Sequence, residues 1–200
     1  MPNPIDFYFD FSSPYGYLAS TRIDALAAKH GRSVVWRPHL LGAVFKVTGQ
    51  QPLPAIPLKG GYARHDLARS ARLFGVPFKL PTKFPMGATA PSRAFYWVND
   101  TDPALAKRLA QALYHAYFAE DRDISSPEVT CEVAGPLGVD KGRLAQALND
   151  PAVKERLRIE VDAAIGRGVF GSPYIVVDGE PFWGSDRLDQ VEKWLETGGW

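Results

Sequence analysis

The strongest structural signal in the chain is the run Ile5-Asp6-Phe7-Tyr8-Phe9-Asp10-Phe11-Ser12-Ser13-Pro14. Residues 5–11 alternate between apolar side chains and polar or aromatic ones, which predicts a β-strand. Ser13 followed by Pro14 is typical of a helix start, because serine caps the first turn and proline is favoured at the first helical position. We therefore expect a strand that turns directly into a helix at Ser13.

The residues that follow predict a strand–helix–strand opening. Apolar side chains recur at helical spacing from Pro14 until His30-Gly31, where the glycine ends the pattern. A second strand is expected over residues 33–37. Because strands joined by a crossover helix run parallel, the opening is predicted to be one βαβ unit.

The C-terminal part of the chain predicts a hairpin followed by a helix. Residues 174–177 form a β-branched run, and Asp178-Gly179 is a strong signal for a two-residue hairpin turn. Residues 180–183 form the returning strand, in which Pro181 favours a position at the edge of the sheet. A last helix is expected over residues 187–195, with its apolar side chains on one face.

The residues between these two ends are predicted to be helical, with an irregular proline-containing loop over 79–91. The expected helices cover residues 62–74, 92–98, 104–118, a helix that opens at Ser126-Pro127, 141–148 and 151–165. The predicted fold class is thus α/β: a thioredoxin-like core (β-α-β, then β-β-α) with a large all-helical insertion. We assign residues 1–45 and 169–200 to the thioredoxin-like domain and residues 46–168 to the helical insertion.

The charge balance and the cysteine count exclude several classes of function. Lys and Arg total 23 and Asp and Glu total 22, so the formal net charge is +1. Nucleic-acid and membrane surfaces favour a basic excess, so neither partner is expected. Cys131 is the single cysteine, which rules out an internal disulfide and a Cys-x-x-Cys redox pair.

Two further classes are not expected. The histidines His30, His39, His65 and His115 lack metal-ligand spacing, so no metal site is predicted. The sequence contains neither a recognisable signal peptide nor an apolar run of the roughly 20 residues that span a bilayer. We therefore expect a cytoplasmic location.

The chain resembles a known family over most of its length. Residues 6–18 closely resemble the opening of 2-hydroxychromene-2-carboxylate isomerases, which belong to the DsbA-like group together with kappa-class glutathione transferases. The similarity continues in residues 40–46, 59–77, 168–173 and 182–188. The resemblance implies glutathione as cofactor, a small bicyclic aromatic acid as substrate and a homodimer.

Ser13 is the predicted catalytic residue. Thiol oxidoreductases of this fold have a Cys-x-x-Cys pair where this chain reads Ser13-Pro14-Tyr15-Gly16, so this protein cannot perform dithiol exchange with its own sulfur. A serine hydroxyl can instead donate a hydrogen bond to the thiolate of a bound thiol and lower the pKa of that thiol. The alternative is a purely structural N-cap. With the resemblance, we expect Ser13 to bind glutathione.

Two other segments are predicted to bind glutathione. In this fold the bond before Pro173 is cis, and the backbone of Ser172 can pair with the cysteinyl unit; the alternative is an ordinary trans loop proline. The resemblance implies that Ser185 and Asp186 hold the γ-glutamyl end, while capping of the last helix is their alternative role. Trp183 and Gly184 belong to the same motif and are included in the predicted site.

The predicted substrate-binding residues are Lys46, Lys59 and Phe84. The resemblance places a lysine at position 46 opposite the substrate carboxylate, and Lys59 lies in a Gly/Pro-rich segment suited to an anionic ligand. Phe84 is a candidate aromatic wall, with packing as its alternative. Arg64 is expected on a solvated helix face. The predicted activity is a glutathione-dependent isomerase; a kappa-type transferase or peroxidase and a non-catalytic binding domain stay open as alternatives.

Overall fold

The structure is a computed structural model that describes residues 3–200. Its centre is a four-stranded sheet with the strand order β2-β1-β3-β4. Strands β1 (Ile5–Phe9) and β2 (Val34–Pro38) are parallel, whereas β3 (Tyr174–Val177) and β4 (Glu180–Trp183) are added antiparallel. The predicted βαβ opening, the C-terminal hairpin and the thioredoxin-like fold are confirmed.

The hairpin between β3 and β4 forms as predicted. Asp178 and Gly179 both have positive φ, at 52° and 95°. Two consecutive left-handed residues give the turn whose twist matches that of paired strands. Pro181 lies in β4, at the edge of the sheet, where its missing N–H costs no interstrand hydrogen bond.

The first helix is interrupted, which the sequence analysis did not predict. Helix α1 (Pro14–Ser20) ends before α2 (Ile23–Lys29) begins. The Ser20 hydroxyl donates to the Tyr17 carbonyl at 2.7 Å, and the Thr21 hydroxyl donates to the Leu18 carbonyl at 2.9 Å. Hydroxyls that bond to carbonyls of the preceding turn compete with the helical ladder, so the single long helix expected over 14–30 is wrong.

The remaining helices follow the predicted pattern with one addition. They are α3 (Leu41–Thr48), α4 (Lys59–Phe74), α5 (Thr89–Asn99), α6 (Pro103–Phe118), α7 (Pro127–Ala134), α8 (Lys141–Ala147), α9 (Pro151–Gly166) and α10 (Leu188–Thr197). The additional helix is α3. Its first-turn Leu41 N–H donates to the carboxylate of Asp10 at 2.7 Å, a cap that comes from 31 residues earlier in the chain.

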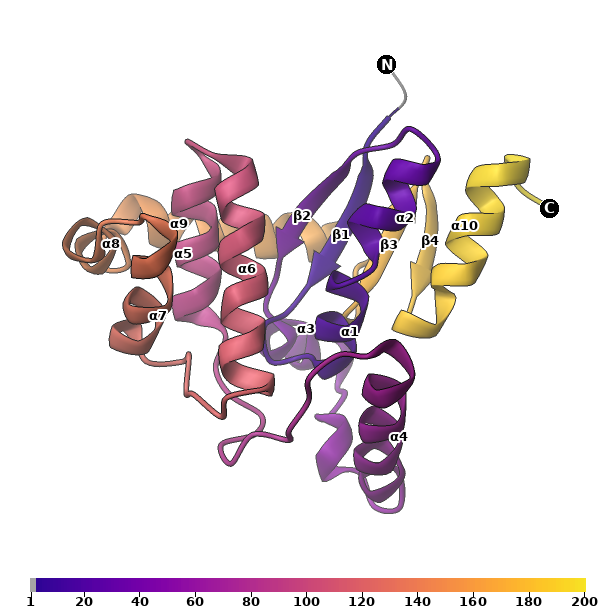
Figure 1. The fold of residues 1–200 in the computed structure, drawn as a ribbon, viewed down its shortest axis with the longest axis horizontal. Helices are drawn as coiled ribbons and strands as arrows, with labels where there is room; N and C mark the ends of the chain where they lie inside the picture. The colour runs from indigo at the N-terminus through magenta and orange to yellow at the C-terminus, as the bar shows by residue number, and fades with distance from the viewer. Residues whose placement is uncertain (1–2) are drawn as a thin grey trace.

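The helices lie on both sides of the sheet and below it (Figure 1). Helices α5–α8 lie at the left of the sheet, α9 runs from this block behind β2 and β1, α10 lies at the right, and α4 projects below α1. Helices α5 and α6 pack against each other, and α1 contacts both α4 and α6. The end of β1 and the start of α1 are thus surrounded by elements from the whole chain.

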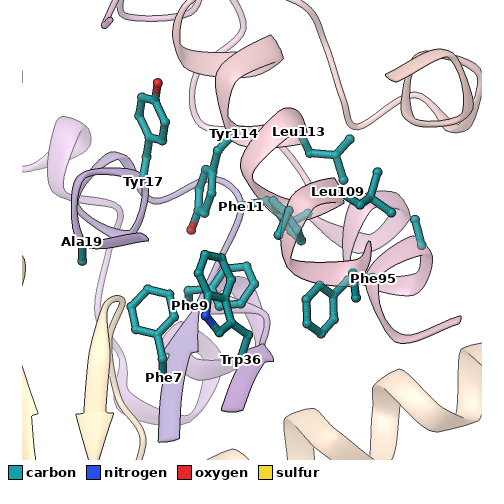
Figure 2. Packing of buried hydrophobic residues seen from close by; sticks show 14 of the residues in the cluster. Phe7, Phe9, Phe11, Tyr17, Ala19, Trp36, Phe95, Leu109, Leu113 and Tyr114 are labelled. Atoms are coloured by element: carbon teal, nitrogen blue, oxygen red, sulfur yellow. The ribbon is translucent and has the colours of Figure 1, made fainter. Parts of the chain in front are cut away.

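The core joins the sheet to the helical block (Figure 2). The ring of Phe9 on β1 packs against Trp36 on β2 at 5.4 Å, Phe95 on α5 at 5.9 Å and Tyr114 on α6 at 5.7 Å. Tyr17 on α1 packs against Tyr114 at 5.6 Å. Because these rings are buried and interlocked, the N-terminus of α1 is held on a rigid support.

Candidate functional site

A cavity of about 980 Å³ opens beside the turn between β1 and α1. Its walls come from this turn, from α3 and α4, from the loop before α5, and from the segments that flank β3 and β4. The predicted site residues that line it are Ser13, Lys59, Phe84, Ser172, Trp183, Gly184, Ser185 and Asp186. Residues far apart in the sequence therefore meet around one space of a size that holds small ligands.

Ser13 is buried at the N-terminus of α1. Its hydroxyl oxygen accepts a hydrogen bond from the Gly16 N–H at 3.0 Å, which confirms the predicted N-cap. The same hydroxyl donates to the backbone carbonyl of Ser172 at 2.9 Å. Because α1 has only seven residues, the partial positive charge at its tip is smaller than that of a long helix, and hydroxyl donors count for more.

The Ser172–Pro173 peptide bond is cis, as predicted. The Ser172 hydroxyl oxygen accepts from the Asp10 N–H at 2.9 Å. Within residues 3–200, the backbone N–H of Ser172 has no hydrogen-bond partner. A partly buried N–H beside a cavity favours a ligand with a backbone carbonyl, because an unpaired donor is costly.

Gly16 occupies the position of the second cysteine in a Cys-x-x-Cys pair. A Cβ atom placed on Gly16 would lie 2.6 Å from the Tyr114 hydroxyl oxygen and 2.9 Å from the Ser172 hydroxyl oxygen. Both distances are shorter than carbon–oxygen contacts allow. The Tyr114 hydroxyl is itself fixed, since it donates to the Asp10 carbonyl at 2.9 Å. The site therefore has no space for a side chain at residue 16.

Ser185 and Asp186 do not cap the last helix, so that alternative is wrong. Residues Ser185–Arg187 form a short 3₁₀ turn, and α10 begins after Arg187 with no side-chain cap. Within the described part of the chain, the Ser185 hydroxyl has no hydrogen-bond partner, although the residue is only 7 % exposed. The Asp186 side chain is 73 % exposed and pairs only with Arg187, at 3.5 Å. Both groups are available to a ligand.

Trp183 forms a rim above the loop that precedes Pro173. Its ring packs edge-on against Phe170 at 4.8 Å, and its indole nitrogen lies so close to Gly171 that a Cβ atom there would overlap it. The Gly171 carbonyl also contacts Nε2 of His39 at 3.1 Å. Burial lowers the pKa of His39, so the neutral ring is favoured and Nε2 carries the donated proton.

His39 was missed by the sequence analysis because its role depends on a contact across 132 residues. The sequence signal that exists is its place directly after a strand, beside an apolar run.

The loop that carries Phe84 is fastened to the end of α6. The Asp121 carboxylate accepts from the Thr82 N–H and the Thr82 hydroxyl, each at 2.7 Å. The Tyr117 hydroxyl donates to the Lys83 carbonyl at 2.7 Å. The next peptide bond, Phe84–Pro85, is cis. Phe84 is thus held against the cavity by contacts at the base of its loop.

The lysines predicted for the substrate end differ in position. Lys59 begins α4 and lines the cavity, whereas Lys46 lies on the exposed face of α3 and does not line it. Arg64, which the sequence places on a solvated face, lines the cavity too. Its guanidinium forms no ion pair with any residue between 3 and 200. The cavity wall on α4 therefore presents two cations.

Tyr15 and Asp66 form a further pair in the cavity wall. The Tyr15 hydroxyl donates to the Asp66 carboxylate at 2.9 Å and joins α1 to α4. Burial, followed by the bond to Asp66, raises the pKa of Tyr15, so the phenol stays protonated at neutral pH. Local sequence patterns do not show this pair, because its members are separated by 51 residues.

Residues 3–200 contain no group of His, Cys, Asp or Glu side chains arranged to hold a metal ion. No helix in the same part of the chain has both the length and the apolar character needed to cross a membrane.

The chain is similar to known proteins over almost its whole length. Residues 4–196 match the family model described as "DSBA-like thioredoxin domain". The chain is 31 % identical to glutathione S-transferase kappa 2 of Caenorhabditis elegans, covering 98 % of this chain and 93 % of that protein. It is 30 % identical to 2-hydroxychromene-2-carboxylate isomerase of Sphingobium xenophagum, covering 98 % and 99 % of the two chains.

A solved structure of a 2-hydroxychromene-2-carboxylate isomerase superposes with a TM-score of 0.87 at 29 % identity, over 96 % of this chain and 94 % of the other. The resemblance found from the sequence is therefore confirmed. The chain belongs to the DsbA-like thioredoxin family, and its full-length relatives there are kappa-class glutathione S-transferases and 2-hydroxychromene-2-carboxylate isomerases.

Proposed function

We propose that the protein is a glutathione-dependent isomerase that interconverts 2-hydroxychromene-2-carboxylate-type acids and open-chain benzylidenepyruvates, within aromatic hydrocarbon degradation. The observation that supports this most is the meeting of Ser13, Ser172 and Asp186 around one cavity. The full-length similarity to isomerases of this name adds the reaction class.

The unpaired groups of the cavity fit the parts of glutathione. The Ser172 N–H suits the backbone carbonyl of the cysteinyl unit, as an added strand would pair. The exposed carboxylate of Asp186, whose partner is Arg187 at 3.5 Å, suits the α-ammonium of the γ-glutamyl end, and the Ser185 hydroxyl suits its carboxylate. Ser13 lines the same cavity as these groups, so its hydroxyl can donate to the thiol of the bound peptide.

A bound glutathione thiolate supplies a reversible nucleophile, which lets a conjugated carbon–carbon double bond become single, rotate and form again. The residues of this chain stabilise the negative charges of the thiolate and of the substrate. Ser13 donates a hydrogen bond that stabilises the thiolate form. Lys59 and Arg64 on α4 hold the substrate carboxylate and the enolate oxygen that develops on the acid. Phe84 and Phe45 give the aromatic part an apolar wall.

Product analysis tests the proposal. The purified protein is incubated with a benzylidenepyruvate and with glutathione or no thiol. We expect conversion that requires glutathione while the glutathione concentration stays constant. Conversion at the same rate without thiol contradicts the proposal.

A kappa-type transferase is the second candidate, because a relative of that class is 31 % identical over the full length. Such an enzyme consumes glutathione and releases a conjugate, so the same experiment separates the two. Binding of glutathione without turnover of either kind favours the non-catalytic binding domain. The homodimer and the cytoplasmic location stay predictions.

A further inference from the structure

We propose that the side-chain hydroxyl of Ser172 is a second hydrogen-bond donor to the sulfur of bound glutathione, and hence a catalytic residue in its own right. This inference rests on the proposed function. It assigns a role to the Ser172 side chain that is separate from the backbone pairing argued above.

The Ser172 hydroxyl has an unused proton, whereas the Ser13 hydroxyl does not. The Ser13 hydroxyl already donates to the Ser172 carbonyl, so its proton is engaged before a ligand arrives. The Ser172 hydroxyl oxygen only accepts, from the Asp10 N–H, and within residues 3–200 its own proton has no acceptor. Since a hydroxyl is both donor and acceptor, Ser172 retains one unused donor beside the cavity that it lines.

The second support is the position of this hydroxyl. A point 2.9 Å from the Ser172 oxygen, where a Cβ of residue 16 would begin, is also 3.3 Å from the Cβ of Ser13. The side chains of Ser13 and Ser172 therefore meet beside the first turn of α1, together with the Tyr114 hydroxyl, which lies 2.6 Å from the same point. Because Gly16 has no side chain, nothing from that residue covers the Ser172 hydroxyl.

The Ser172 hydroxyl is also held in a fixed position. Asp10 holds the Ser172 oxygen through its N–H, and Tyr114 holds Asp10 through its carbonyl. The Asp10 carboxylate accepts from the Ser12 N–H at 2.6 Å and the Leu41 N–H at 2.7 Å. A donor that is already oriented loses little entropy when it bonds to a ligand.

The titratable groups packed around this arrangement are Asp10, His39 and Tyr114. Burial lowers the pKa of His39 and raises that of Tyr114, so both are neutral at physiological pH. Asp10 is the nearby carboxylate, and it is the same in every variant below.

The Ser13 and Ser172 hydroxyls differ in whether they must lose a hydrogen bond before they can donate to sulfur. Ser13 must break its bond to the Ser172 carbonyl before it can donate to sulfur. Ser172 can donate while it keeps the bond from Asp10. A thiolate that accepts from both is stabilised more than one that accepts from Ser13 alone, because each charge-assisted hydrogen bond lowers the free energy of the thiolate form.

The test compares two ligands by calorimetry: glutathione and S-methylglutathione, which has the same peptide but no ionisable thiol. The variants are Ser172→Ala and the control Ser172→Thr, which keeps the hydroxyl. We expect Ser172→Ala to weaken glutathione binding about tenfold and to leave S-methylglutathione binding within about twofold. We also expect the pKa of the bound thiol, followed by thiolate absorbance, to rise by about one unit in Ser172→Ala only.

Each result has a definite meaning. If Ser172→Ala weakens both ligands equally, the hydroxyl acts only in the structure, through the Asp10 N–H left unpaired, and the inference is wrong. It is also wrong if neither binding nor the thiol pKa changes, or if Ser172→Thr behaves like Ser172→Ala. If wild-type protein binds neither ligand, the proposed function itself fails.

Discussion

The hydroxyl of Ser13 donates a 2.9 Å hydrogen bond to the backbone carbonyl of Ser172, 159 residues further along the chain. This bond fastens the turn before α1 to the loop before β3. It also directs the Ser13 proton toward the backbone of Ser172, with which a bound peptide is proposed to pair. The two sides of the candidate thiol site are therefore joined before any ligand binds.

Ser13→Ala separates the capping role of Ser13 from its catalytic role. The matched control is Ser126→Ala, because Ser126 also precedes a proline and caps α7 by accepting from the Val129 N–H at 3.3 Å. Each variant loses about 1 kcal/mol of unfolding free energy with its cap, and Ser13→Ala loses more because the Ser172 carbonyl also loses its donor. Only Ser13→Ala lowers kcat/KM, by on the order of 100-fold, because it alone removes a donor to the thiolate. Equal activities of the two variants would reduce Ser13 to a cap.

Gly16→Ala tests the close packing at the fourth position of the motif. The added methyl group meets the Tyr114 and Ser172 hydroxyls, so we expect a loss of about 1–3 kcal/mol in urea unfolding. Gly61→Ala, in α4 with nothing within 4 Å of an added Cβ, is the control and gains roughly 0.5–1 kcal/mol.

The Tyr114→Phe background identifies the clashing group. Without the phenol oxygen the nearer of the two contacts disappears, so Gly16→Ala costs less there than in wild type. A double-mutant cycle measures the difference. An unchanged cost would show that Tyr114 is not the residue that excludes a side chain.

Lys59→Met and Lys46→Met test which lysine binds the acid. Lys59 lines the cavity and Lys46 does not. We expect Lys59→Met to raise KM for the acid about tenfold with little change in glutathione affinity, because a bond to a charged group is lost. Lys46→Met stays within about twofold of wild type. The reverse order would place the substrate carboxylate beside α3.

The lowered pKa of Asp121 predicts that the protein loses stability at acid pH. Bonds from Thr82 and Lys79 lower its pKa from 3.8 to about 2. A carboxyl group whose pKa is lower in the folded state stabilises the fold above its unfolded pKa and loses that contribution as pH falls toward the folded value. Asp121→Asn is the comparison, because asparagine tolerates the left-handed φ of 60° but does not titrate here.

Urea unfolding of wild type and Asp121→Asn over a pH series gives the readout. We expect wild type to be the more stable by a constant margin above about pH 5. This margin shrinks as pH falls through the unfolded pKa of 3.8 toward about 2. A margin that does not depend on pH would mean that the Asp121 charge contributes nothing.

Features that depend on neighbouring residues were predictable from the sequence. Ser13 and Ser126 cap helices with the side chains that the sequence pattern indicated. The Asp178-Gly179 turn also forms as expected. In each case the interaction closes within a few residues, so the local pattern contains the information.

Features that depend on distant residues were not predictable. Helix α3 is capped by Asp10, and His39 bonds to Gly171, across 31 and 132 residues. The break between α1 and α2 arises from local hydroxyl–carbonyl bonds that hydrophobic periodicity does not indicate. The 3₁₀ turn at Ser185 depends on the position of this segment in the fold. Most of the predicted site residues line one cavity, but only the fold shows that Arg64 joins them and Lys46 does not.

The cavity is assembled from two unrelated sets of segments. The predicted glutathione-binding residues come from the turn at Ser13, the Ser172 loop and residues 183–186, whereas the rest of the lining includes residues 50–64 and the loop bearing Phe84. Asp121 and Tyr117 secure that loop at its base. Under the proposed function, substitutions in the second set change which organic acid fits the cavity and leave the predicted glutathione-binding residues of the first set in place.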